Sequence, residues 1–298
     1  MRKFLLSCLG IASLAVAGAA NAADIPRPAY KAPPPPVVAP IYNWSGIYIG
    51  GHVGAGWGNK WWNTTETTIC ELFSDIGACS NPESPFNPNN LNIVPGNSLG
   101  TTSVDGFLGG GQVGFNWQTG LFVWGVEADA SWTNMKGQFP CIFTLLTCSS
   151  KIDWIATVVG RVGVTVLDRI LVYGGGGGAW AHEKDRVDFF GVTFDGFVIP
   201  PFSFSGSDNK WGWTFLAGTE YAFAPNWSIK LQYNYYQFGR HNVHLTQDTD
   251  ICAPFLPEGC IPPGTALSNA DTQLRIHSIK LGLNYRFTWG KAPVVASY

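Results

Sequence analysis

Few side chains in this sequence have the types and spacing of a catalytic site. His277 and Ser278 are the one adjacent pair of histidine and serine, residue types that act together as base and nucleophile. The residues around them alternate as in a β-strand, in which neighbouring side chains point to opposite faces. His277 and Ser278 then cannot form the required hydrogen bond, and the sequence predicts no enzymatic activity.

No metal ion or cofactor is predicted either. Four side chains able to bind a divalent metal share one polar stretch: His241, His244, Asp248 and Asp250. A solvated loop is the simpler interpretation of these residues. The glycine run at 174–178 does not indicate a phosphate-binding loop, because neither a Lys-Ser or Lys-Thr pair nor a helix pattern follows it.

Charged residues instead recur on the more polar faces of predicted strands. They are Glu127, Asp129, Glu220, Arg161, Lys230, Lys280 and Arg286. If these strands close into an eight-stranded barrel, the interior is only wide enough for the barrel's own side chains. Buried charges must then pair. The sequence predicts a network of ion pairs that plugs the interior; a narrow or gated pore is the alternative.

The stretch at 273–287 shows the strand pattern most clearly. From Ile279 onward one face carries Ile279, Leu281, Leu283, Tyr285 and Phe287, and the other carries Lys280, Gly282, Asn284 and Arg286. A period of two indicates a strand with two different faces. The chain shows no helix pattern that would cover the apolar face, so we expect lipid to cover it. A shift of one residue would place basic side chains in lipid, at roughly 2–4 kcal/mol each near the bilayer midplane.

Eight stretches follow this pattern. They are 43–58, 104–118, 121–134, 151–167, 170–183, 210–224, 227–240 and 273–287. Short turns at 119–120, 168–169 and 225–226 alternate with long connections at 59–103, 135–150, 184–209 and 241–272. Such alternation and an even number of strands are typical of outer-membrane barrels. The predicted fold is all-β: an eight-stranded antiparallel transmembrane up-and-down β-barrel with four long external loops.

A soluble eight-stranded barrel is the alternative fold. It would carry apolar residues inside and charges outside. Tryptophans instead lie near the strand ends, as in the girdles of membrane proteins: Trp44, Trp57, Trp117, Trp132, Trp154, Trp180, Trp211 and Trp227. This placement favours the membrane barrel.

The cysteines fall into three close pairs. Apart from Cys8 near the amino terminus, they are Cys70 and Cys79, Cys141 and Cys148, and Cys252 and Cys260. Each pair lies in one predicted external loop, so we expect three disulfides that each close a small ring, in an oxidising compartment. Metal binding is the alternative, but no loop carries four clustered ligands.

Both termini lie outside the predicted barrel. Residues 1–22 form a basic, then apolar segment that ends in Ala-Asn-Ala, which predicts a secretory signal cleaved between Ala22 and Ala23. The proline-rich stretch at 23–42 is predicted to be an extended periplasmic linker, either a tether or a contact with the cell wall. We assign 43–287 to the barrel and 288–298 to a periplasmic tail.

Charge and composition exclude one class of partner. The chain has 18 basic and 20 acidic residues, and removal of the signal segment takes two basic residues away. The mature chain is therefore acidic overall, which does not favour nucleic-acid binding.

The motif NWSGIYIGGHVGAGW after a proline-rich leader, the eight-strand pattern, and LGLNYRF near the end are similar to one known family. They resemble the small porin-like outer-membrane barrels of alphaproteobacteria, which include 25 and 31 kDa surface antigens. The resemblance covers 43–287 and implies a surface-exposed outer-membrane protein with a role in envelope integrity, some members having proposed pore activity. Barrels of this kind usually end in an aromatic assembly signal, which here is either Phe287 or Tyr298.

These observations predict a non-enzymatic, integral protein of the Gram-negative outer membrane that displays disulfide-bonded loops. A narrow porin-like channel for small solutes is the alternative function. The expected partners are outer-membrane lipid and lipopolysaccharide, the barrel-assembly machinery, and the cell wall through the linker.

Overall fold

Eight long antiparallel strands close into a barrel in the order β1-β12-β9-β8-β5-β4-β3-β2. The computed structural model describes residues 42–64, 98–141, 146–194, 197–248, 250–252, 260–261, 263 and 266–287. The barrel strands are β1 (Gly46–Thr64), β2 (Ser98–Thr119), β3 (Phe122–Cys141), β4 (Leu146–Val166), β5 (Ile170–Phe189), β8 (Phe202–Ala222), β9 (Trp227–Gln247) and β12 (Ala266–Phe287). The predicted fold class is confirmed.

Two short hairpins lie in the long connections between barrel strands. β6 (Val192–Phe194) pairs with β7 (Phe197–Ile199), and β10 (Ile251–Cys252) pairs with β11 (Cys260–Ile261). No helix in the described part of the chain is both long and apolar enough to cross a membrane.

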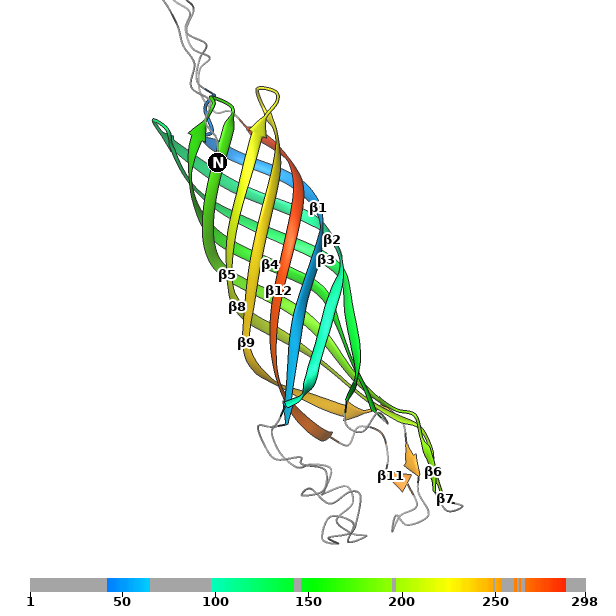
Figure 1. The fold of residues 1–298 in the computed structure, drawn as a ribbon. Coiled ribbons are helices and arrows are strands. Elements are labelled where there is room, and N and C mark those ends of the chain that lie inside the picture. Colours follow the sequence, from blue (N-terminus) through cyan, green and yellow to red (C-terminus); the bar gives the residue numbers. More distant parts are fainter. Residues whose placement is uncertain are drawn as a thin grey trace, which may run out of the picture. The chain divides into compact units, whose positions relative to one another are not determined.

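The first and last barrel strands close the ring (Figure 1). β1 pairs with β12 from Ile47 opposite Phe287 to Thr64 opposite Ala270. Because every barrel strand has a hydrogen-bonded neighbour on both sides, the sheet has no open edge. Closure is the condition for placing strands in lipid, where an unpaired backbone group has no water to bind.

Apolar side chains cover the outside of the barrel and polar side chains line its inside. On β12, Ile279, Leu281 and Leu283 remain 45–49% exposed, whereas Lys280 and Asn284 on the other face are each 1% exposed. The predicted alternation on this strand is confirmed. A soluble barrel would show the opposite arrangement, so the exposed apolar face is suited to lipid.

Outward aromatic residues mark two rims of the apolar band. At the end with short turns, Trp117 is paired with Trp124 and Trp227 with Tyr285. Towards the other end, the outer wall carries four tryptophans on neighbouring strands: Trp132, Trp154, Trp180 and Trp211. On β3 the band runs from Trp124 to Trp132, close to the ~9–11 residues that cross a bilayer at a tilt.

The predicted bounds of the long loops are wrong, because the strands continue well past the outer tryptophans. The long strands β1, β3, β5 and β9 (Figure 1) extend to Thr64, Cys141, Phe189 and Gln247. Beyond the tryptophans the outward positions become polar, as at Asn134 and Lys136, while the ladder of backbone pairs continues. The end of the apolar alternation therefore indicates the edge of the lipid-facing band, and the strand itself continues beyond it.

The predicted short turns are confirmed in place. Gly120 takes a left-handed φ of 61° between β2 and β3, and Leu167 and Asp168 take φ of 52° and 49° between β4 and β5. Left-handed residues match the twist of tight hairpins.

We predict that Val158→Arg destabilises the barrel by roughly 2–4 kcal/mol, because this outward residue lies midway along the apolar band of β4. Thr101→Arg, on the polar outward extension of β2, should change stability by less than about 1 kcal/mol. Urea unfolding in lipid vesicles measures both. Equal effects of the two substitutions would show that the band does not face lipid.

Candidate functional site

The interior of the barrel holds a dense network of charged side chains centred on Glu127 of β3. One Glu127 oxygen accepts a 2.8 Å bond from Lys230 of β9. The other accepts a 2.7 Å bond from the Tyr48 hydroxyl and a 3.3 Å bond from Arg161. Glu127 and Lys230 are each 1% exposed, so the carboxylate joins three walls of the barrel and is shielded from bulk solvent.

Arg161 of β4 lies between two aromatic rings. Its guanidinium is 4.7 Å from the ring centre of Tyr48 and 4.9 Å from that of Tyr173. Each ring rests on bare backbone, since an added Cβ would collide with the Tyr48 ring at Gly114 and with the Tyr173 ring at Gly218. Glycine at these two positions therefore provides the space that the sandwiched guanidinium requires.

A second carboxylate, Asp129, is paired with Lys280. Lys280 donates a 2.8 Å bond to one oxygen and Thr157 donates a 2.7 Å bond to the other. Beside them His52 bonds to Gln112 through Nδ1 and to Ser131 through Nε2, at 2.5 and 2.8 Å. All of these side chains are buried.

The remaining two predicted network residues, Glu220 and Arg286, lie closer to the end of the barrel with the short turns. Glu220 accepts a 2.8 Å bond from Asn284 and lies 3.6 Å from Arg161. Arg286 contacts no carboxylate among the described residues. Its guanidinium instead lies 4.2 Å from the ring centre of Tyr42 and donates a 3.2 Å bond to the Pro225 carbonyl. The structure thus brings together six of the seven predicted charges and places Arg286 with aromatic residues.

A second buried charged cluster was not predicted. Lys60 bonds to Asp185 and lies 2.8 Å from Glu183, and Lys210 lies 2.5 Å from Glu183. Their side chains are 0–2% exposed. Sequence analysis missed this outer charged cluster because 59–103 and 184–209 were predicted to be loops. The sequence did contain a signal for this cluster, because Glu183 and Asp185 are two residues apart and therefore lie on the same face of a strand.

An apolar cluster separates the two charged groups. It contains Val104, Met135, Ile152, Ile155, Ala179, Ala181, Tyr236, Phe238, Leu274 and Ile276, none more than 1% exposed. Further out, Trp62 and the Cys141–Cys148 disulfide form another buried group. The interior therefore alternates between charged and apolar layers.

The arrangement offers little for catalysis. His277 faces outward between Trp57, Tyr233 and Tyr235, while Ser278 points inward and is fully buried. The prediction that they lie on opposite faces is confirmed. Sequence analysis missed the contact between His52 of β1 and Ser131 of β3, which lie on either side of Gly110 of β2. Both are buried, and the group beyond the histidine is an amide, Gln112, which carries no charge.

The structure describes one predicted disulfide. Cys141 and Cys148 are bonded, with Cα atoms 5.7 Å apart, where β3 gives way to β4. Cys252 and Cys260 are directly paired residues of β10 and β11. Cys70, Cys79, the cleavage site at Ala22 and Ala23, and the tail from 288 lie outside the described residues.

Residues 9–287 match the family model described as outer membrane protein beta-barrel domain. The chain belongs to this outer-membrane family. The match includes every described strand, so the closed ring and its lipid-facing band are those of a Gram-negative outer-membrane protein.

Curated relatives agree with this assignment over nearly their whole length. The chain is 30% identical to the 31 kDa outer-membrane immunogenic protein of Brucella melitensis, covering 93% of this chain and 98% of the relative. It is 24% identical to the 25 kDa outer-membrane immunogenic protein of Brucella abortus, covering 95% and 97%. The crystal structure of OprG from Pseudomonas aeruginosa is similar with a TM-score of 0.43 at 11% identity, covering 82% of this chain and 97% of OprG.

We predict that Glu127→Gln destabilises this outer-membrane barrel by about 3–5 kcal/mol, because it removes the carboxylate that pairs with buried Lys230 and leaves Arg161 with the more distant Glu220 alone. Asp153→Asn, which removes an ion-paired carboxylate from the outer wall, should cost about 0–1 kcal/mol. Urea unfolding in lipid vesicles measures the difference. The double variant Glu127→Gln with Lys230→Met should recover part of the loss, and strict additivity would show that the pair is not coupled.

Proposed function

We propose that this protein is a structural barrel of the outer membrane that is closed to solutes and displays its external loops at the cell surface. The observation that carries the proposal is the filling of the interior. Two charged groups and the apolar cluster between them occupy the lumen, with side chains 0–6% exposed.

A conducting pore needs a continuous path for water, and the described interior opposes one at three levels. A solute would have to separate Glu127 from Lys230 and Arg161, and then Lys60 and Lys210 from Glu183. Separation of a buried ion pair leaves an uncompensated charge. Between these levels Tyr236 and Phe238 would have to move out of a packed apolar cluster. The geometry therefore favours a plug over a pore.

The external end of the barrel supports a role in display. The Cys141–Cys148 disulfide closes the connection between β3 and β4, and the backbone pairing of Cys252 with Cys260 brings a second predicted pair together. The relatives are named as immunogenic proteins, which supports surface exposure. In this proposal the barrel is the anchor, and its loops carry disulfides.

The same proposal assigns the partners. Outer-membrane lipid and lipopolysaccharide would surround the apolar band, the barrel-assembly machinery would insert the chain, and the linker before Tyr42 would contact the cell wall. A barrel held in this way would contribute to the integrity of the envelope without chemical activity.

We predict that the purified barrel gives no sustained conductance steps in planar bilayers. Lys280→Ala should remain silent too, because the apolar cluster and the outer charged cluster still close the lumen. Insertion is verified by the difference in gel mobility between boiled and unboiled samples. Steady channels in the wild type whose ion selectivity shifts in Lys280→Ala would instead establish the alternative, a narrow solute channel.

We predict that the long connections lie outside the cell. A cysteine in place of Ser207, exposed on the extension of β8, should react with an impermeant maleimide on intact cells. A cysteine in place of Thr119, at the short turn after β2, should react only after the outer membrane is permeabilised. The reverse order of labelling would invert the topology.

A further inference from the structure

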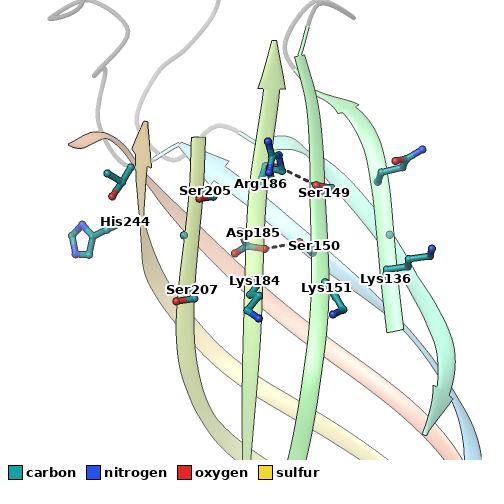
Figure 2. Close-up of a pocket in the computed structure, with 14 residues that line it drawn as sticks. Lys136, Ser149, Ser150, Lys151, Lys184, Asp185, Arg186, Ser205, Ser207 and His244 are labelled. Atoms are coloured by element: carbon teal, nitrogen blue, oxygen red, sulfur yellow. Dashed lines mark hydrogen bonds between the residues drawn. The ribbon is translucent and has the colours of Figure 1, made fainter. Parts of the chain in front are cut away.

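Three lysines lie side by side on the outer wall of the barrel (Figure 2). Lys136 of β3 is paired with Lys151 of β4, and Lys151 is paired with Lys184 of β5. Like charges directly opposite each other destabilise a sheet. A row of three on neighbouring strands, here called the lysine row, therefore requires a compensating partner.

The row is only partly neutralised by the protein. Asp153 lies 2.8 Å from Lys151 and 2.7 Å from Lys184, yet the side chains of these lysines remain 54% and 57% exposed. Lys136 is exposed and forms no ion pair or hydrogen bond among the described residues. Asp105 is its neighbour on β2 but makes no ion pair with it. Outward ammonium groups therefore remain available to an external anion.

The lysine row borders a concavity of about 1060 Å³. The charged side chains that face this concavity are Lys136, Lys151, Lys184 and Arg186, accompanied by hydroxyl donors such as Ser205 and Ser207 (Figure 2). Arg186 is already held by Asp188 at 2.8 Å and lies 3.9 Å from Asp248. Asp185, although part of the same wall, directs its carboxylate inward to Lys60. Among the described residues, Lys136 is therefore unpaired, and Lys151 and Lys184 share the single carboxylate of Asp153.

The height of the lysine row on the barrel wall indicates which kind of anion it meets. On β3, Lys136 follows Trp132, and on β4 Lys151 precedes Trp154, so the lysines lie immediately outside the tryptophans that mark the rim of the apolar band. Their side chains leave the barrel sideways, as the outward tryptophans do, towards the head groups of surrounding lipid. An anion carried by a lipid head group meets the row at this height.

We propose that the lysine row binds the phosphate groups of the lipopolysaccharide that surrounds the barrel in the outer leaflet. Lysine ammonium groups bind phosphate as compact point charges, and basic residues at a membrane surface attract anionic head groups. The bound phosphates compensate the repulsion within the row and fix the lipid against one wall of the barrel. This inference rests on the proposed sidedness of the long connections, and it is independent of whether the lumen conducts.

The test uses the purified full barrel in nanodiscs of zwitterionic lipid that contain a small fraction of diphosphorylated lipid A. Native mass spectrometry counts the lipid A molecules retained. The variant Lys136→Gln with Lys184→Gln leaves Lys151 paired with Asp153 and removes the excess charge. We expect lipid A binding roughly 30-fold weaker, since each basic residue near an anionic surface contributes about fivefold.

A matched variant removes the same charge from the opposite wall. Arg240→Gln with Arg275→Gln changes two outward basic residues on the extensions of β9 and β12 and should retain lipid A as the wild type does. Binding to the wild type should also fall from diphosphorylated to monophosphorylated and to dephosphorylated lipid A. Gel mobility shows whether each variant folds. Because the lipid series uses the wild-type protein alone, it tests the proposal even if a variant does not fold.

Three outcomes would overturn the proposal. Equal retention by wild type and the Lys136 and Lys184 variant would show that the row is not the site. Displacement of lipid A by equimolar inorganic phosphate would show a site for a free anion. Binding of a soluble sulfated polysaccharide in place of lipid A would assign the row to an external polyanion. The maleimide experiment on Ser207 and Thr119 separates these outcomes from an error in sidedness.

Discussion

The pairing of β1 with β12 is the constraint on which the rest of the molecule depends. The other seven contacts between barrel strands join chain neighbours, whereas this one joins the two ends of the barrel sequence. In lipid each open backbone group would cost several kcal/mol, so a sheet that failed to close here would not be stable in the membrane. Closure with eight strands also sets the diameter, and the diameter leaves the interior room for side chains alone.

The narrow interior explains its composition. Charges such as Glu127 and Lys230 are excluded from lipid by the register and are shielded from bulk solvent inside the barrel, so they are stabilised by each other. Large rings fit only where the facing backbone is bare, which is why Tyr48 lies over Gly114 and Tyr173 over Gly218. Charge pairing and close packing are thus two consequences of the same small radius.

The outside of each strand passes through two environments. Between the aromatic rims the outward residues are apolar, as at Val158, and beyond the outer rim the same face carries Lys151 and its neighbours. Inside, charged and apolar layers alternate, because the apolar cluster and then the outer charged cluster follow the network around Glu127. The long strands therefore extend the barrel wall beyond the lipid-facing band. Its outer surface carries charge where lipid head groups lie.

The sequence by itself determined the number of strands, their order and the face that meets lipid. The periodicity at Ile279–Phe287 is local, and a shift of one residue would move every side chain to the wrong face. It also placed Glu127, Asp129, Arg161, Glu220, Lys230 and Lys280 inside. These features were predictable because each depends on the alternation within a single strand and on the surroundings of its two faces.

Only the tertiary structure decided which charges pair, how far the strands extend, and that three lysines stand in a row. Glu127 contacts Lys230 across the lumen, and Lys136, Lys151 and Lys184 meet through the register of three strands. Arg286 joins Tyr42 instead of a carboxylate for the same reason: its partner is set by depth in the barrel. Depth and neighbour depend on tilt and shear of the closed sheet, which no alternation within a single strand encodes.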